Sequence, residues 1–187
     1  MNGLIPFEGD TYIRAELEAL RDRLGLTSCV ETGTQFGATT QAFCEMFEYV
    51  ISIEADKGFL WVADARLKDI ANVHLIEGFS QNELRAIATS DTLYYLDAHG
   101  CAVGGCPLKQ ELQILADASL TNIVIAIHDF KVPDKDFGFD EYDYQLSIEE
   151  IEPLLHKVFK NPAWHYNTEA NGAYRGIIYI YEGDAAN

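Results

Sequence analysis

The chain has 187 residues, which corresponds to one domain because domains commonly hold ~150 residues. Apolar residues make up 48% and charged residues 23%, a globular composition that excludes disorder, collagen and coiled coil. The 13 Lys and Arg against 30 Asp and Glu give a net charge of −17, which repels phosphate backbones and anionic lipids. We therefore expect neither nucleic acid nor a membrane surface as a partner.

The sequence carries no sign of a membrane-spanning or secreted protein. Its longest apolar runs, such as Ile123–Ile127 and Ile177–Tyr181, hold five residues, far fewer than the ~20 that a spanning helix needs. Residues Met1–Glu8 lack the basic stretch and long apolar core of a secretory signal. We expect a cytoplasmic protein whose cysteines are reduced thiols.

Short apolar, β-branched segments alternate with helical patterns along the chain. The first helical pattern has an Asp10 cap and ends before Gly25. In chain order, the expected elements are helix Asp10–Leu24, strand Ser28–Glu31, helix Ala38–Phe47, strand Tyr49–Glu54, helix Lys57–Ile70, strand Asn72–Glu77, helix Gln81–Ala88, strand Thr92–Asp97, helix Leu108–Ala118, strand Asn122–His128, helix Ser147–Phe159 and strands Trp164–Thr168 and Arg175–Tyr181.

This alternation predicts an α/β fold with a doubly wound, mostly parallel, Rossmann-like sheet. The last two strands follow each other with an Asn171-Gly172 turn signal between them, which predicts an antiparallel C-terminal hairpin. We therefore expect a seven-stranded sheet in a single domain over residues 1–187, with residues 1–25 as an N-terminal covering helix. Residues 131–146 form a long acidic and aromatic loop, which we interpret as a candidate lid.

A glycine-containing turn follows the first expected strand and opens the next helix. Gly33 and Gly37 allow the backbone to approach a ligand closely, and the free N–H groups of a helix start favour a negative group. Neither the G-x-G-x-x-G dinucleotide pattern nor a Walker A lysine is present, because Gln35 stands where the middle glycine would be. The turn is therefore expected to bind a ligand other than a dinucleotide or a nucleoside triphosphate.

Two acidic residues indicate which ligand this is. Glu31 stands two residues before Gly33, and a carboxylate there suits a positive amine rather than a phosphate. Glu54 ends the second expected strand, at a spacing where an acid typically binds ribose hydroxyls. An amine, a carboxylate and a ribose together describe S-adenosylmethionine.

At these residues the sequence resembles class I S-adenosylmethionine-dependent methyltransferases. Glu31-x-Gly33-x-x-x-Gly37 is similar to their first motif, and Glu54 falls in their ribose-binding acidic loop. The resemblance implies that Glu31, Gly33 and Gly37 contact the methionine part of the donor and that Thr34 and Asp97 also bind the donor. It also implies that Phe79 and Ser80 lie where these enzymes hold the adenine.

A second group of polar residues follows the fourth and fifth expected strands. Asp97 and His99 follow one strand, and His128 and Asp129 follow the other. Neighbouring strands lie ~5 Å apart, so these four side chains are expected to share one small volume beside the methyl donor. Burying such groups is costly unless they are used, which makes all four candidate catalytic residues.

Two interpretations of this group remain open. In one, Asp97, His128 and Asp129 hold a divalent cation, Mg or Mn, an arrangement similar to that of metal-dependent O-methyltransferases, although His128 stands where they usually have Asp. In the other, His99 or His128 is the general base and an aspartate orients it. His99, Cys101 and Cys106 supply three zinc ligand types but lack the spacing of a zinc site.

The sequence therefore predicts an S-adenosylmethionine-dependent methyltransferase that acts on a small-molecule acceptor, with a hydroxyl as the favoured acceptor atom. Two alternatives stay open: a nucleoside-binding protein without turnover, and a metal-dependent enzyme of other chemistry on the same fold. The presence of acid and base groups at the strand ends favours an enzyme. A homodimer is compatible with the sequence, which does not specify the oligomeric state.

Overall fold

The computed structural model describes residues 4–99 and 105–184. Within these residues no helix has the length and apolar character that crossing a membrane requires. In chain order, the elements are the 3₁₀ helix η2 (Pro6–Gly9), α1 (Thr11–Leu24), β1 (Ser28–Thr32), α2 (Ala38–Met46), β2 (Tyr49–Glu54), α3 (Lys57–Leu67), β3 (Val73–Glu77), α4 (Ser80–Ile87), β4 (Thr92–Leu96), α5 (Leu108–Asp117), β5 (Ile123–Ile127), α6 (Ile148–Val158), β6 (Pro162–Tyr166) and β7 (Ile178–Glu182).

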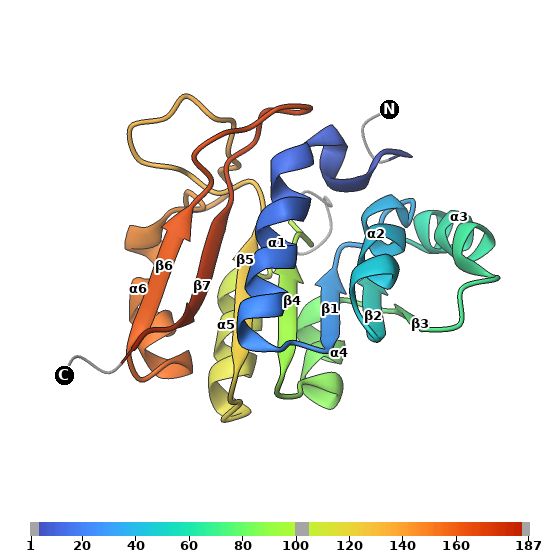
Figure 1. Cartoon of the computed structure of the whole chain (residues 1–187), viewed down its shortest axis with the longest axis horizontal. Coiled ribbons are helices and arrows are strands. Elements are labelled where there is room, and N and C mark those ends of the chain that lie inside the picture. The colour runs from blue at the N-terminus through green and yellow to red at the C-terminus, as the bar shows by residue number, and fades with distance from the viewer. Residues whose placement is uncertain (1–3, 100–104, 185–187) are drawn as a thin grey trace.

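The seven strands form one sheet in the order β3-β2-β1-β4-β5-β7-β6 (Figure 1). The first five strands pair in parallel, and β7 pairs antiparallel with both β5 and β6. This confirms the expected doubly wound sheet and its antiparallel C-terminal end. The strand order reverses between β1 and β4, which in open α/β sheets is where ligands bind.

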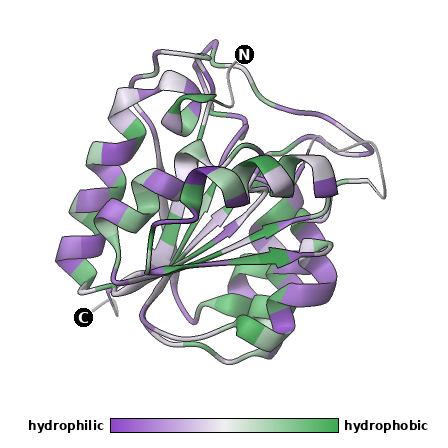
Figure 2. Cartoon of the chain, turned by 90° about the vertical axis from the view of Figure 1, so that its right-hand side faces the viewer, coloured by the Kyte–Doolittle hydropathy of each residue, from purple (hydrophilic) through white to green (hydrophobic). Residues whose placement is uncertain are grey.

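Helices cover both faces of the sheet, with α1 and α2 on one face and α4, α5 and α6 on the other (Figure 1). Successive strand residues alternate between the two cores: Cys29, Leu93 and Val124 pack with α1 and α2, whereas Val30 and Tyr94 pack with the opposite helices. The hydropathy of the residues differs between strands and helices: the strands are largely apolar, whereas the helices also carry hydrophilic residues (Figure 2). The apolar strand segments lack a period of two because both faces are buried.

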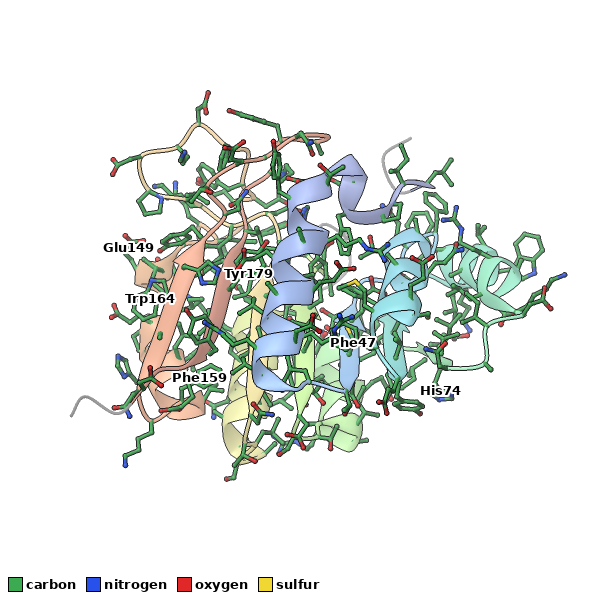
Figure 3. All side chains as sticks on the ribbon, in the orientation of Figure 1. Phe47, His74, Glu149, Phe159, Trp164 and Tyr179 are labelled. Carbon is green, nitrogen blue, oxygen red and sulfur yellow. The ribbon has the colours of Figure 1, made fainter. Side chains whose placement is uncertain are left out.

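The aromatic side chains of the sheet ends divide between the same two cores. Phe47, at the end of α2, and Tyr179 on β7 belong to the core beneath α1. Phe159 and Trp164 belong to the core beneath α6 (Figure 3). Pro162 opens β6, which is possible because this strand lies at the edge of the sheet.

The N-terminal helix forms as its sequence predicts. The Asp10 side chain accepts a hydrogen bond from the Tyr12 amide at 2.8 Å, which caps α1. Gly25 ends the helix in the left-handed conformation, with φ of 65°. The helix covers the sheet, and the preceding η2 segment lies at the end of the molecule where the parallel strands end (Figure 1).

The connection between β6 and β7 differs from a simple hairpin turn. A turn does form at Asn171-Gly172, where the Tyr174 amide donates to the Asn171 carbonyl at 3.0 Å. However, β6 ends at Tyr166 and β7 begins at Ile178, so the turn lies within a longer connection. This connection contacts the N-terminal segment, because the Thr11 amide donates to the Asn171 side chain at 2.9 Å. Beside the strand ends, the Asn167 side chain accepts from the Ile177 amide at 2.9 Å and donates to the Arg175 carbonyl at 3.1 Å, so side-chain hydrogen bonds are made where the longer strands were expected.

The acidic loop, residues 131–146, is attached to the same connection. The Gly138 amide donates to the Tyr174 carbonyl, and the Gly176 amide donates to the Gly138 carbonyl, both at 2.9 Å. Phe137 and Leu146 are buried. Within the part of the chain that the structure describes, no residue of this loop lines the cavity at the strand ends. Its role as a lid stays a prediction.

Candidate functional site

A cavity of about 340 Å³ opens at the carboxyl ends of β1, β2 and β4. Its volume lies within the range of ~300–1,000 Å³ that is typical of small-molecule sites. Residues expected to bind the donor or to act in catalysis are brought together on its wall: Gly33, Thr34, Glu54, Phe79, Ser80, Asp97, His99 and Asp129. Glu31, Gly37 and His128 do not line it.

Gly33 makes the close approach that the glycine turn predicts. Its φ is +90°, and a Cβ at this position would overlap the carbonyl oxygen of Asp97. The Asp97 amide donates to the Thr32 carbonyl at 3.0 Å, so the ends of β1 and β4 are held together. No residue with a side chain fits here without moving the strand end, which explains the glycine.

Gly37 serves the packing of the turn rather than the cavity wall. It precedes α2 with φ of +73°, and a Cβ there would lie 3.1 Å from the Ala63 side chain on α3. Gly37 therefore allows α2 and α3 to approach each other behind the turn. Its expected role in donor binding stays a prediction.

Glu31 lies behind the cavity wall and is 1% exposed. Thr40 and Ser52 both donate from their hydroxyl groups to its Oε2 atom. Burial raises the pKa of Glu31 to about 7, although these two hydrogen bonds lower it. In this arrangement Glu31 braces the turn against α2 and β2, and its direct contact with a ligand amine stays a prediction.

Glu54, at the end of β2, organises the opposite side of the turn. Its Oε2 atom accepts from the Gln35 amide at 2.7 Å, and its Oε1 atom accepts from the Asp56 amide at 2.8 Å. Glu54 and the neighbouring Ala55 both line the cavity. The carboxylate is therefore held in one orientation, as a ribose-binding acid requires.

Phe79 and Ser80 stand at the start of α4. Phe79 is an exposed aromatic side chain at 38% exposure, and it lines the cavity. The Ser80 hydroxyl is buried and has no hydrogen-bond partner among the described residues. The exposed aromatic face of Phe79 is suited to stacking on a planar base, whereas the Ser80 hydroxyl lies near Glu111 and lowers the pKa of that carboxyl.

The four polar residues after β4 and β5 meet as expected. His99 Nε2 lies 3.6 Å from Asp97 Oδ1 and 3.7 Å from Asp129 Oδ2. His128 Nδ1 lies 3.7 Å from Asp97 Oδ1 and 3.3 Å from Asp129 Oδ1. Both imidazoles are buried, and neither ring nitrogen of His99 has a hydrogen-bond partner among the described residues.

The two histidines differ in charge. Burial lowers the pKa of His99 to about 4, so its ring is neutral near pH 7. Burial also acts to lower the pKa of His128, but the Asp97 and Asp129 carboxylates outweigh it and raise the pKa to about 9. His99 is therefore the neutral imidazole that can accept a proton, and His128 is a cation that holds the two carboxylates.

The two aspartates also differ in charge. Desolvation raises the pKa of Asp97 well above its ordinary value despite the nearby His128. Desolvation acts in the same direction on Asp129, but His128, His99 and Arg175 outweigh it and lower the pKa of Asp129. Asp129 is therefore the ionised carboxylate of the pair, and Asp97 is the one that holds a proton more readily.

Two residues that the sequence analysis did not select complete the site. Arg175, just before β7, donates from Nε to Asp129 and from Nη2 to Asp140 in the acidic loop. Glu8, in η2, lines the cavity. Neither lies in a strand-end pattern, and the fold alone brings them to the carboxyl end of β5.

The site offers two groups of candidate metal-ligating atoms, each with all atoms within 4.8 Å of one another. One group contains Asp97, His99 and Asp129, and the other contains Glu8, His128 and Asp129. The expected set of Asp97, His128 and Asp129 is divided between these two groups and stays a prediction. Mixed imidazole and carboxylate ligands fit a divalent cation such as Mn better than Mg. Asp129 is common to both groups, but Arg175 already compensates its charge.

The structure does not test a zinc site made of His99, Cys101 and Cys106. Cys101 lies outside the described residues. The Cys106 thiol accepts a hydrogen bond from the Tyr144 hydroxyl at 3.3 Å, and Cys106 packs against the core beneath α5 and α6. This contact assigns Cys106 to the packing of the acidic loop on the domain.

Comparison with known proteins gives matches in structure only. No family model matches the sequence, and no curated protein matches it. The O-methyltransferase TomG from Streptomyces achromogenes, solved in complex with S-adenosylmethionine, matches with a TM-score of 0.66 at 14% identity, over 92% of this chain and 80% of that chain.

Two further solved structures match over most of both chains. The precorrin-6y C5,15-methyltransferase from Geobacter metallireducens matches with a TM-score of 0.58 at 13% identity, over 92% of this chain and 87% of that chain. The precorrin 8w decarboxylase from Methanobacterium thermoautotrophicum matches with a TM-score of 0.61 at 15% identity, over 97% of both chains. These likenesses show that the chain has the class I methyltransferase fold.

Proposed function

We propose that this protein transfers the methyl group of S-adenosylmethionine to a small-molecule acceptor, with a hydroxyl as the favoured acceptor atom. The observation that carries the proposal is one cavity whose wall joins two kinds of residue. Gly33, Glu54 and Phe79 have the character expected of a donor site, and Asp97, His99 and Asp129 have that of an acid–base site. The match to TomG in complex with S-adenosylmethionine supports the same donor.

On the donor side, the residues have separate roles. The Gly33 turn provides backbone contacts for the methionine part, Glu54 accepts from ribose hydroxyls, and Phe79 and Ser80 contact the adenine. The reaction is an in-line displacement: the acceptor oxygen forms a bond to the methyl carbon as the carbon–sulfur bond breaks. The electron pair remains on sulfur, giving the neutral thioether S-adenosylhomocysteine.

On the acceptor side, we assign proton removal to His99. Its neutral ring and its unpartnered nitrogens allow it to accept the hydroxyl proton, and Asp129 would stabilise the resulting imidazolium at 3.7 Å. His128 positions the two aspartates. The enzyme's part is therefore to align the two reactants and remove one proton.

A divalent cation is compatible with this arrangement, and Asp97, His99 and Asp129 would hold it. When bound, it would lower the pKa of an acceptor hydroxyl. The Arg175–Asp129 ion pair favours the histidine base, because a cation at this position would have to share Asp129 with a guanidinium.

The test is calorimetric titration of the protein with S-adenosylmethionine, and separately with NAD, in EDTA and then with Mg or Mn. We expect S-adenosylmethionine to bind and NAD not to bind, and Glu54→Gln to weaken donor binding. S-adenosylhomocysteine formation with hydroxylated small molecules is measured in the same buffers. Binding of NAD instead, or no binding of either, would refute the proposal.

The same experiment separates the two alternatives. Donor binding without formation of S-adenosylhomocysteine under any condition indicates a nucleoside-binding protein. Turnover that needs metal and forms no S-adenosylhomocysteine indicates other chemistry on this fold. A requirement for Mn in methyl transfer would replace the histidine-base assignment by the metal-dependent one.

A further inference from the structure

Glu8 brings an additional carboxylate to the acceptor side of the cavity. It belongs to the 3₁₀ segment η2 and lines the cavity together with Asp97, His99 and Asp129. One of its carboxylate oxygens lies within 4.8 Å of ligating atoms of both His128 and Asp129. An N-terminal residue therefore reaches the centre of the group that follows β4 and β5.

The position of Glu8 is fixed by its neighbours. The ring of Phe7 is 3% exposed and packs edge-on against Phe43 and Tyr95, at centroid distances of 5.4 Å and 6.0 Å. The Phe7 amide donates to the Thr39 hydroxyl at 2.9 Å. The Glu8 carbonyl accepts from the Ala173 amide at 3.2 Å. Glu8 is thus part of the cavity wall rather than of a loose terminus.

Glu8 has no Lys or Arg partner, and although His128 lies in the same cluster, the two form no ion pair among the described residues. All 13 Lys and Arg of the sequence lie in the described ranges, and none lines the cavity. Within these ranges no hydrogen bond or ion pair engages the Glu8 side chain. Arg175, the basic residue bonded to Asp129, is occupied by Asp129 and Asp140.

The acidic side chains that line the cavity are Glu8, Glu54, Asp97 and Asp129, and no Lys or Arg lines it. Of these carboxylates, Asp129 pairs with Arg175, and Glu54 accepts from two backbone amides. Glu8 has neither kind of partner among the described residues. A partly desolvated carboxylate without a partner is unfavourable, and a cationic ligand group relieves this cost.

A second observation indicates a polar ligand at the same place. His99 lines the cavity, its side chain is 1% exposed, and neither of its ring nitrogens has a hydrogen-bond partner among the described residues. Buried polar atoms in native proteins are normally paired. The cavity therefore holds both a carboxylate without a Lys or Arg partner and an imidazole without a hydrogen-bond partner.

We propose that the acceptor carries an ammonium group and that Glu8 pairs with it. The inference rests on the proposed methyl transfer and narrows its substrate class to small amine-bearing molecules. Phosphorylated or carboxylated acceptors are disfavoured, because no Lys or Arg lines the cavity to bind them. The ammonium group serves recognition, whichever acceptor atom receives the methyl group.

The test uses the full chain saturated with S-adenosylhomocysteine, in EDTA, and matched probe pairs that differ by an ammonium group. Suitable pairs are glucosamine with glucose and tyramine with 4-ethylphenol, compared by calorimetry. We expect the ammonium member of at least one pair to bind about tenfold more tightly, and Glu8→Gln to remove that advantage. Glu141→Gln, a matched change in an exposed loop residue, should preserve it.

Three results would overturn the proposal. The first is equal binding, or no binding, of both members of every pair. The second is a Glu8→Gln variant that weakens S-adenosylmethionine itself, which would assign Glu8 to the donor. The third is loss of Mn binding in that variant, titrated separately without EDTA, together with no ammonium preference, which would make Glu8 a metal ligand. If the wild-type protein does not bind S-adenosylmethionine, the proposed methyl transfer is refuted, and this result is distinct from the three above.

Discussion

Arg175 donates from its Nε atom to the carboxylate of Asp129, and its Nη2 atom donates to Asp140 in the acidic loop. Asp129 follows β5 and has a φ of 56°, whereas Arg175 precedes β7. One guanidinium therefore joins three segments that are distant in the sequence. It also orients the carboxylate that faces His99 and His128.

Replacing Arg175 should destabilise the protein and disturb the site together. Arg175→Ala leaves the largely buried Asp129 carboxylate, at 14% side-chain exposure, without its guanidinium partner, so we expect a loss of about 3 kcal/mol in the free energy of unfolding. Arg175→Lys should recover only part of it, because an ammonium cannot bond both carboxylates as a planar guanidinium does. Urea denaturation measures both changes.

A surface ion pair provides the control for this prediction. Arg85 pairs with Asp117 at 2.9 Å, and the two side chains are 63% and 42% exposed. Arg85→Ala should cost less than about 1 kcal/mol. Similar losses in the free energy of unfolding for Arg85→Ala and Arg175→Ala would show that the Arg175–Asp129 pair contributes no more to stability than an exposed ion pair.

Gly33→Ala should damage the donor site more than the same change at another left-handed glycine. A Cβ on Gly33 would overlap the Asp97 carbonyl, whereas a Cβ on Gly25, at φ of +65°, meets nothing within 4 Å. Gly25→Ala should therefore cost about 1 kcal/mol, the ordinary penalty for an unsuitable backbone conformation. Gly33→Ala should cost more and weaken S-adenosylmethionine binding at least tenfold.

Thermal unfolding and donor titration together check this pair of variants. If Gly33→Ala does not fold, Phe79→Ala tests the same site without touching the backbone, because Phe79 is exposed at 38%. Unchanged donor affinity in both Gly33→Ala and Phe79→Ala would contradict the assignment of the cavity.

Much of the fold and half of the site follow from local sequence patterns. Apolar strands that alternate with capped helices determine a doubly wound sheet, and parallel strands necessarily end at one edge. For this reason the sequence alone predicts that Asp97 and His99 lie beside His128 and Asp129. Their meeting depends only on β4 and β5 being neighbours.

The remaining features depend on contacts that no local pattern encodes. Glu8 reaches the site because Phe7 packs between Phe43 and Tyr95, and Arg175 reaches it because the β6–β7 connection bends back over β5. The position of Glu31 behind the wall depends on Thr40 and Ser52, whose hydroxyls come from two different elements. Sequence spacing alone could not distinguish a ligand-binding acid from one that braces the turn.

The two imidazoles of the site should titrate at opposite ends of the accessible pH range. We expect His99 to stay neutral down to about pH 4 and His128 to stay protonated up to about pH 9, since burial dominates the pKa of His99 and the aspartates dominate that of His128. Nitrogen-15 NMR of the ring signals, assigned with His99→Gln, measures both. Two imidazoles that both titrate near pH 6.5 would remove the basis for choosing His99 as the base.

The pKa of His128 also has a consequence for stability. A raised folded-state pKa means that the stabilisation is present below the unfolded value of 6.5 and is lost as the pH rises through about 9. The wild-type protein should therefore lose stability between these pH values. A His128→Gln variant should lack that part of the pH dependence, which urea denaturation at a series of pH values would reveal.

Glu111 should make the protein less stable as the pH rises through the acidic range. It lies on α5, is fully buried, and neither carboxyl oxygen has a hydrogen-bond partner among the described residues. Burial raises the pKa of Glu111 from 4.5 to about 7. The folded state therefore binds the proton more tightly than the unfolded state, and the stabilisation present below pH 4.5 is lost as the pH approaches 7.

We expect the free energy of unfolding to fall by about 3 kcal/mol between pH 4.5 and pH 7. Glu111→Gln should remove this decrease, because an amide does not titrate in this range. Glu152→Gln, a matched change on the exposed side of α6, should leave the pH dependence unchanged. Urea denaturation between pH 4.5 and 7.5 compares the three proteins. Parallel curves for the wild type and Glu111→Gln would mean that Glu111 is already ionised in the folded protein. The Ser80 and Thr32 hydroxyls, which lower the pKa of Glu111, would then outweigh its burial.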